Sequence, residues 1–306
     1  MMTGLLGPIT STLWWQAAFD RYDSVLSQPV TKRPVILYNA DMDGFAASYF
    51  AFKSLQARFG NLAIQSRPVW NFEYDFRWLP DYLLLLKTDL LVCVDLPVIQ
   101  EPAMLQEAAK RCPVIIYDHH VVPSNLPPPP GSVTFLNPRV LGVPSDDHPA
   151  TAFTGAAALT QNVIIPSELL LLAAGLKGDR ALDKYPALME AMKQFAPSFA
   201  QSPLESRSPL ARFAARINDL FRARPSEQLP QLQYRLATLL ATQPVDCAIA
   251  SFAEEFELEK AATDTQREVN RYLGDRRIFP VAKAPPQSLV PPRQPAHGGT
   301  EAFERL

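Results

Sequence analysis

Short apolar runs alternate with segments of helical periodicity along the first half of the chain. Short runs with few polar residues are typical of strands that a parallel sheet buries on both faces. The expected strands are Val35–Tyr38, a weaker Leu62–Val69, Leu90–Val94, Val114–Tyr117 and Val133–Leu136. The expected helices are Leu13–Leu26, Gly44–Phe59, Pro80–Leu86 and Ala103–Arg111. Strands that alternate with helices predict an α/β fold with a doubly wound, mostly parallel sheet.

From Ala150 onward the pattern is helical. The expected helices are Ala150–Leu159, Ser167–Leu176, Tyr185–Phe195, Leu210–Phe221, Leu229–Ala241 and one long helix, Cys247–Leu273. Arg276–Val281 is a candidate for the start of a further strand. The residues after it are rich in proline and glutamine, which is typical of disorder. We therefore expect a helical segment and a truncated C-terminal region after the sheet.

The composition indicates a chain with a substantial core and no strong overall field. The 306 residues suffice for one large domain or two ordinary ones, and 47% of them are hydrophobic. The net charge of −2 excludes a global basic field that would recruit nucleic acid, although a local basic groove is compatible with it. Three scattered cysteines favour buried thiols in a reducing cytoplasm. No signal-peptide pattern or membrane-length apolar run is found, so we expect a cytoplasmic protein that contacts no membrane.

The stretch Val35–Ser48 ends an apolar strand with two carboxylates. Asp41 and Asp43 are spaced i and i+2, so in extended chain they point to the same face. Carboxylates converge where a divalent cation lies between them, and open α/β sheets place their sites at the ends of buried strands. The EF-hand alternative fails because the sixth and twelfth loop positions would be Ala46 and Phe52.

Two other interpretations of this stretch stay open at this point. A haloacid-dehalogenase-like phosphatase would use Asp41 as the nucleophile and Asp43 as the acid/base, with Asp179 and Asp183 holding Mg²⁺. A purely structural interpretation makes the acidic pair a helix cap.

Two further apolar strands also end in polar groups. Asp95 follows one of them, and Asp118, His119 and His120 follow the next. Three strand ends of this kind in one domain are hard to explain by solubility, and oxygen and imidazole ligands without thiolate suit Mn²⁺ or Mg²⁺. Neighbouring residues in extended chain face apart, so His119 and His120 should have different roles.

Outside the strands, a helix end carries Asp179 between glycine and basic residues. Arg139, Lys177 and Arg180 are candidate substrate-binding groups for phosphate. His148 lies in a proline-rich loop with two aspartates, so we expect it to be exposed rather than ligating.

The chain resembles the DHH phosphoesterase superfamily, which includes RecJ-type exonucleases, oligoribonucleases and type II inorganic pyrophosphatases. The resemblance spans about residues 34–180. It depends on four stretches in order: Asn39-Ala40-Asp41-Met42-Asp43-Gly44, then Asp95, then Asp118-His119-His120, then Asp179.

The resemblance implies a site with two Mn²⁺ ions, Mg²⁺ being the alternative. It implies that Asp41 holds the first ion and Asp43 the second, that Asp95 bridges both, and that His119 and Asp179 complete the second ion's ligands. Two catalytic roles are implied as well: His120 faces the phosphate and Asp118 orients the histidines. The chain departs from the family at Asn39, the remaining metal-ligand position, where members of this subtype commonly carry His.

The resemblance also implies a division of the chain and an activity. We expect an N-terminal helix (1–33), a metal-binding domain (34–180), a helical connector (181–275) and a remnant of the accessory domain or a disordered tail (276–306). The expected function is hydrolysis of a nucleotide or short oligonucleotide by water attack at two metal ions, in a possible homodimer. The alternative is a catalytically decayed domain that binds nucleic acid or protein. The substrate itself is not legible in the sequence.

Overall fold

The structure is a computed structural model. It describes residues 2–27, 33–60, 63–122, 130–137, 139, 148–224 and 228–278. The chain divides into two units, Met1–Thr265 and Gln266–Leu306. The sheet, the core helices and the candidate site belong to the first unit.

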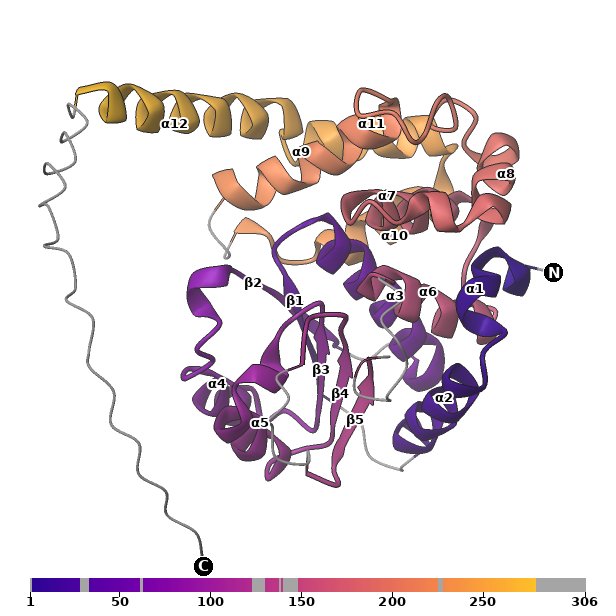
Figure 1. Ribbon diagram of the computed structural model, residues 1–306, viewed down its shortest axis with the longest axis vertical. Helices are drawn as coiled ribbons and strands as arrows, with labels where there is room; N and C mark the ends of the chain where they lie inside the picture. Colours follow the sequence, from indigo (N-terminus) through magenta and orange to yellow (C-terminus); the bar gives the residue numbers. More distant parts are fainter. Residues whose placement is uncertain are drawn as a thin grey trace, which may run out of the picture. The chain divides into compact units, whose positions relative to one another are not determined.

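A five-stranded parallel sheet lies at the centre of this unit (Figure 1). The strands are β1 (Pro34–Asn39), β2 (Gln65–Val69), β3 (Leu90–Val94), β4 (Val114–Tyr117) and β5 (Val133–Leu136). Their order in the sheet is β2-β1-β3-β4-β5, with neighbouring strands all parallel. This confirms the α/β fold that the alternating pattern predicts.

Helices cover both faces of the sheet because alternate strand residues point to opposite sides. On one face, residues such as Leu37 and Cys93 pack against α4 (Leu79–Leu86) and α5 (Pro102–Ala109). On the other, residues such as Ile36 join a larger core. Helices contributing to that core are α2 (Leu13–Leu26), α3 (Met42–Phe59), α6 (Ala150–Thr160), α7 (Leu169–Gly178), α8 (Pro186–Phe195), α9 (Pro209–Ala223), α10 (Leu232–Thr242) and α11 (Val245–Glu255).

The two halves of the sheet meet between β1 and β3. After β1, the chain passes through α3 on one face of the sheet and enters β2, which is one neighbour of β1. It then passes through α4 on the other face and enters β3, which is the other neighbour of β1. The strand order therefore reverses at β1 and β3, and the crevice outside the carboxyl ends of such strands is where open α/β sheets bind ligands.

The remaining elements are short helices and the long C-terminal helix, which contributes Leu258 and Ala261 to the larger core. They are η1 (Met2–Leu6), α1 (Gly7–Thr10), η2 (Asn71–Glu73), η3 (Val98–Gln100), η4 (Pro166–Glu168), η5 (Leu182–Lys184) and α12 (Leu258–Ile278). In the part of the chain that the structure describes, no helix combines the length and apolarity needed to cross a membrane.

Two predictions in the C-terminal half are wrong. The single helix Cys247–Leu273 is two helices, α11 and α12, which a turn at Glu257 with φ of 49° separates. The strand at Arg276–Val281 is also wrong for residues 276–278, which are helical, and residues 279–281 lie outside the described residues. The fourfold division of the chain stays a prediction.

Other expectations fall partly or wholly on residues that the structure does not describe. Leu62 at the start of the second predicted strand is one of them. Most of the proline-rich loop, including Asp146 and Asp147, and the proline-rich tail also lie outside the described residues.

Candidate metal centre

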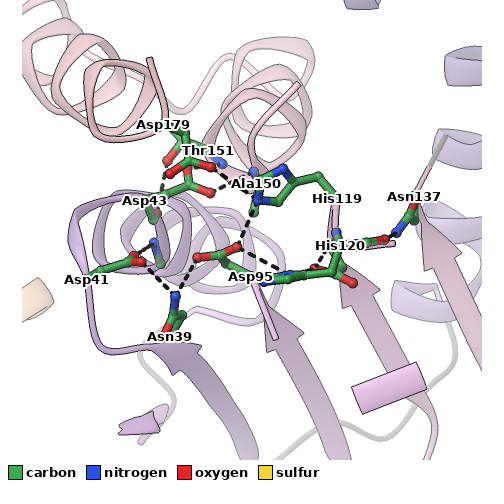
Figure 2. A network of polar contacts seen from close by, with 12 residues as sticks. Asn39, Asp41, Asp43, Asp95, His119, His120, Asn137, Ala150, Thr151 and Asp179 are labelled. Atoms are coloured by element: carbon green, nitrogen blue, oxygen red, sulfur yellow. Dashed lines mark hydrogen bonds and ion pairs between the residues drawn. The ribbon is translucent and has the colours of Figure 1, made fainter. Parts of the chain in front are cut away.

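Side chains from three strand ends and one helix end converge at the carboxyl edge of the sheet (Figure 2). Asp41 and Asp43 follow β1, Asp95 follows β3, and His119 follows β4. Asp179 comes from the C-terminal end of α7. The predicted ligand positions, distant in sequence, are therefore brought to one place.

The tight start of α3 holds the first two carboxylates at the end of β1. Asp41 is the N-cap of α3, and its Oδ1 accepts a hydrogen bond of 2.9 Å from the Gly44 backbone N–H. A Cβ atom at Gly44 would lie 2.2 Å from the Asn39 carbonyl oxygen. Only glycine allows the helix to start this close to the strand, which explains its place after the two acids.

Asp43 is buried and fixed by the start of α6. Its Oδ2 accepts a hydrogen bond from the Ala150 N–H and its Oδ1 accepts one from the Thr151 N–H, both at 2.9 Å. The Thr151 hydroxyl also donates to the Asp43 carbonyl oxygen at 3.0 Å. The helix N-terminus thus satisfies a carboxylate that burial would otherwise penalise.

Asp95 points into the centre from a left-handed backbone conformation with φ of 55°. This conformation is costly for a residue with a side chain and is typical of functional positions. The buried Asp95 Oδ1 has no hydrogen-bond partner among the described residues. The nearest nitrogen is His119 Nε2 at 3.2 Å, which also lies 3.1 Å from Asp179 Oδ2.

His120 is anchored separately, by the preceding Asp118. The Asp118 Oδ1 lies 2.6 Å from His120 Nδ1 and also accepts a hydrogen bond from the His120 N–H. Burial lowers the pKa of His120, but the hydrogen bond and charge of Asp118 outweigh it, so the pKa is raised overall. Because Nδ1 is paired with Asp118, Nε2 is the ring nitrogen of His120 that remains for other contacts; that the two histidines have different roles stays a prediction.

Asn39 lies at the opposite corner and contacts two of the acids. Its Nδ2 donates to Asp41 Oδ2 at 2.6 Å and to Asp95 Oδ2 at 3.1 Å. The Tyr74 hydroxyl donates to Asn39 Oδ1 at 2.7 Å. Burial, and then the charges of Asp95 and Asp41, raise the pKa of Tyr74, so this hydroxyl keeps its proton.

The carboxylates of this centre are poorly compatible with one another unless a cation is present. Burial raises the pKa of Asp43 well above its usual range, and the charges of Asp95 and Asp179 add to the effect. Burial and Asp41 raise the pKa of Asp95 in the same direction. Burial also raises the pKa of Asp41, against the Gly44 hydrogen bond. A divalent cation would remove the repulsion.

The donor atoms fit such a cation. Two groups of ligand atoms, each within 4.8 Å of one another, share His119: Asp43, His119 and Asp179, and Asp95, His119 and His120. The resemblance implies Asp43, Asp95, His119 and Asp179 as the ligands of one ion, and we call these four residues the cation cluster; it contains all of the first group and two residues of the second. The buried Asp95 Oδ1 accepts no hydrogen bond among the described residues and lies beside the ring nitrogens of His119 and His120, an arrangement that a cation would explain directly.

The three predicted phosphate-binding residues differ in how the structure holds them. Arg139 donates through Nε to the His119 carbonyl oxygen at 3.1 Å. Lys177 donates through Nζ to the Leu204 carbonyl oxygen at 2.5 Å. Arg180 is exposed, one residue after Asp179. Arg139 therefore holds the backbone at His119, whereas Lys177 and Arg180 lie at the C-terminal end of α7.

The sequence analysis misplaces one residue and misses others. His148 is buried, not exposed as predicted, and its Nδ1 lies 2.5 Å from the Tyr185 hydroxyl. The contact of Tyr74 with Asn39 has no signal in the aromatic-rich sequence around it. The backbone donors to Asp43 are visible only as a helix start after Pro149.

Among known proteins, only solved structures match. No protein-family model matches the chain, and no curated protein matches it. RecJ of Thermus thermophilus in complex with Mn²⁺ matches with a TM-score of 0.56 and 22% identity, over 88% of this chain and 40% of that one. An exonuclease RecJ bound to manganese matches with a TM-score of 0.56 and 19% identity, over 86% of this chain and 69% of that one.

A third structure supports the same fold. The DHH domain of a member of the s1p family of ribosomal proteins matches with a TM-score of 0.51 and 15% identity, over 83% of this chain and 61% of that one. The chain thus spans less than half of the first RecJ. These similarities show that the chain shares the fold of these RecJ and DHH-domain structures.

Proposed function

We propose that this chain, which has the DHH phosphoesterase fold, is a metal-dependent hydrolase that cleaves a nucleotide-containing phosphoester. The observation that carries the proposal is the convergence of candidate ligand atoms: one group from Asp43, His119 and Asp179 and another from Asp95, His119 and His120, with the buried Asp95 Oδ1 accepting no hydrogen bond among the described residues. Two of the similar structures are described with bound manganese, which supports Mn²⁺ as the cation; Mg²⁺ suits the same oxygen donors.

A cation held by Asp43, Asp95, His119 and Asp179 would supply charge neutralisation of the phosphate and a lowered pKa of bound water. The protein's own contribution is to hold these donors rigidly. Asp43 is fixed by the backbone N–H groups of α6, and Asp95 by its strained position after β3.

His120 is the proposed proton donor to the leaving group. Its Nδ1 is held by Asp118, so its Nε2 can carry the proton toward the substrate, and the raised pKa keeps the ring protonated to higher pH. Asp118 acts through His120 by fixing its orientation. Water is the proposed nucleophile, with no covalent intermediate.

The basic residues around the centre are proposed to bind the phosphate. Arg180 is exposed next to Asp179, and Lys177 lines a neighbouring cavity of about 590 Å³ together with Arg180 and Ser206. Arg139 is tied to the His119 backbone and is proposed to act beside it. A nucleotide or short oligonucleotide as substrate, a homodimer and a cytoplasmic location are parts of this proposal that depend on the family resemblance.

The test is a hydrolysis panel with Mn²⁺ and with Mg²⁺. It covers short oligoribonucleotides, single-stranded DNA, cyclic dinucleotides, 3′-phosphoadenosine 5′-phosphate and pyrophosphate. The matched control is Asp179→Asn, which changes an exposed ligand position without altering side-chain size. We expect metal-dependent turnover that the variant loses. Turnover that persists in chelator, or is equal in the variant, contradicts the proposal.

Two alternative functions are distinguished by the same panel. Hydrogen bonds from Asn39 to Asp41 and Asp95 favour, as a second candidate, a decayed domain that binds nucleic acid or protein. It predicts oligonucleotide or protein binding without turnover. The haloacid-dehalogenase mechanism needs a free carboxylate at Asp41, yet both of its oxygens accept hydrogen bonds. A trapped phospho-aspartate would favour it.

A further inference from the structure

The amide of Asn39 lies where the resemblance implies the first of two cations. Figure 2 shows its nitrogen pointing between Asp41 and Asp95, at distances of 2.6 and 3.1 Å from their Oδ2 atoms. Both N–H bonds of this amide are therefore used on carboxylates. A hydrogen-bond donor between two carboxylates partly neutralises them, which is the task that a cation has in such a place.

The orientation of this amide opposes the binding of a cation at the same corner. A cation would need the amide oxygen, because the Asn39 nitrogen carries its protons inward. The amide would have to turn over, and Asn39 would give up both hydrogen bonds to carboxylates. It would also exchange the hydrogen bond that the Tyr74 hydroxyl donates to Oδ1 at 2.7 Å. Tyr74 thus holds the amide in the orientation that opposes metal binding.

The surroundings of Asp41 lead independently to the same conclusion. Its Oδ1 accepts from the Gly44 N–H as the helix cap, and its Oδ2 accepts from Asn39. Neither candidate group of metal ligands in the described part of the chain includes Asp41, whereas both include His119. The candidate ligand atoms therefore come from Asp43, Asp95, His119, His120 and Asp179, and not from Asp41.

We infer that the Asn39 amide replaces one of the two cations implied by the resemblance, so that each chain binds a single divalent ion at the cation cluster. This inference depends on the metal site of the proposed function and deepens it. Asp41 becomes a structural cap of α3 and a hydrogen-bond acceptor, and Asn39 and Tyr74 become positioning residues. The corresponding two-ion prediction would then be wrong for this chain.

The test is the number of Mn²⁺ ions bound by the full chain, measured by calorimetric titration and by the electron paramagnetic resonance signal of free Mn²⁺. We expect one ion for the wild type. In Asn39→Asp, a carboxylate oxygen of similar size replaces the amide N–H donor. Three carboxylates (residues 39, 41 and 95) then face one another, and a bound cation would relieve their repulsion. We expect two ions there, with affinity for the second raised at least about 100-fold, the equivalent of two lost charge-assisted hydrogen bonds.

Two matched variants separate the ligands from the cap. Asp41→Asn keeps a good N-cap and should leave the affinity for the single ion within about threefold of the wild type. Asp179→Asn should abolish binding of the single ion. Circular dichroism checks that each variant is folded.

Each outcome decides between the proposals. A wild type that binds two ions, an Asn39→Asp variant that binds only one, or an Asp41→Asn variant that weakens the single ion more than about tenfold overturns the inference. All three of these outcomes leave the proposed hydrolase intact. A folded wild type that binds no ion overturns both.

Discussion

Replacement of Gly44 by alanine tests whether the close approach of α3 to the end of β1 positions Asp41 and Asp43. The new Cβ would lie 2.2 Å from the Asn39 carbonyl oxygen and 2.8 Å from the Asn39 nitrogen. An ordinary carbon–oxygen contact is about 3.3–3.6 Å, so the overlap is about 1 Å, and it is with backbone that cannot rotate away. We expect the free energy of unfolding to fall by about 3 kcal/mol, near the upper end of the range for overpacking, with the gain from the higher helix propensity of alanine already included.

The assay is thermal unfolding together with Mn²⁺ affinity. At about 2 °C per kcal/mol for a chain of this size, the midpoint should fall by about 6 °C. Mn²⁺ affinity should fall as well, because β1 and α3 must move apart. The control is Gly7→Ala in α1, where the new Cβ meets nothing within 4 Å. A Gly44→Ala variant with the midpoint and affinity of the wild type would refute this account of the strand-to-helix turn.

Other perturbations give equally direct outcomes. His120→Ala should lower the metal-dependent rate by about 10²–10⁴-fold, as expected for loss of a general acid; an unchanged rate contradicts that role. Asp118 raises the pKa of His120, so Asp118→Asn should move the alkaline limb of the pH–rate profile to lower pH; a limb that stays in place excludes this coupling. Burial raises the pKa values of the Asp43 and Asp95 carboxyls above their ordinary value of 3.8, so the metal-free folded chain binds protons that the unfolded chain has already released. The stability of the metal-free chain therefore falls as the pH rises from the unfolded-state pKa through the raised folded-state pKa. The gain in unfolding temperature on adding Mn²⁺ should therefore be larger near about pH 8 than near about pH 5, and an equal gain would contradict it. Tyr185→Phe removes one hydrogen-bonding partner of buried His148 and should lower the free energy of unfolding in urea by about 1–3 kcal/mol, with no such loss expected for Tyr234→Phe, whose side chain is exposed.

The sheet could be predicted from the sequence because its strands carry their own signal. Leu90–Val94 and Val114–Tyr117 are apolar at every position, and the structure has β3 and β4 with these same bounds. Such strands are buried on both faces, so no polar position interrupts the pattern. The end of each strand is then marked by its first polar residue, which places Asp95 and Asp118 at one edge.

The break in the long C-terminal helix carried no comparable signal. The turn occurs at Phe256 and Glu257, and neither glycine nor proline marks it. Phe252 is buried and packs against Phe256 with ring centroids 4.7 Å apart. The local sequence is compatible with a continuous helix, so tertiary packing decided against local propensity here.

Side-chain contacts between residues far apart in the chain could not be predicted from the sequence either. His148 lies among prolines and acids in the sequence, and its ring nitrogen contacts the hydroxyl of Tyr185, which is 37 residues away. The aromatic stretch that contains Tyr74 has neither helical nor strand periodicity, so its hydrogen bond to Asn39 had no local signal. Periodicity reports which face of an element is buried, not which side chain of another element meets it.

The most direct test of the central claim is anomalous diffraction at the manganese edge from crystals of the chain grown with Mn²⁺. The account predicts a manganese peak bounded by Asp43, Asp95, His119 and Asp179. A well-ordered centre with no manganese among these four side chains would contradict it.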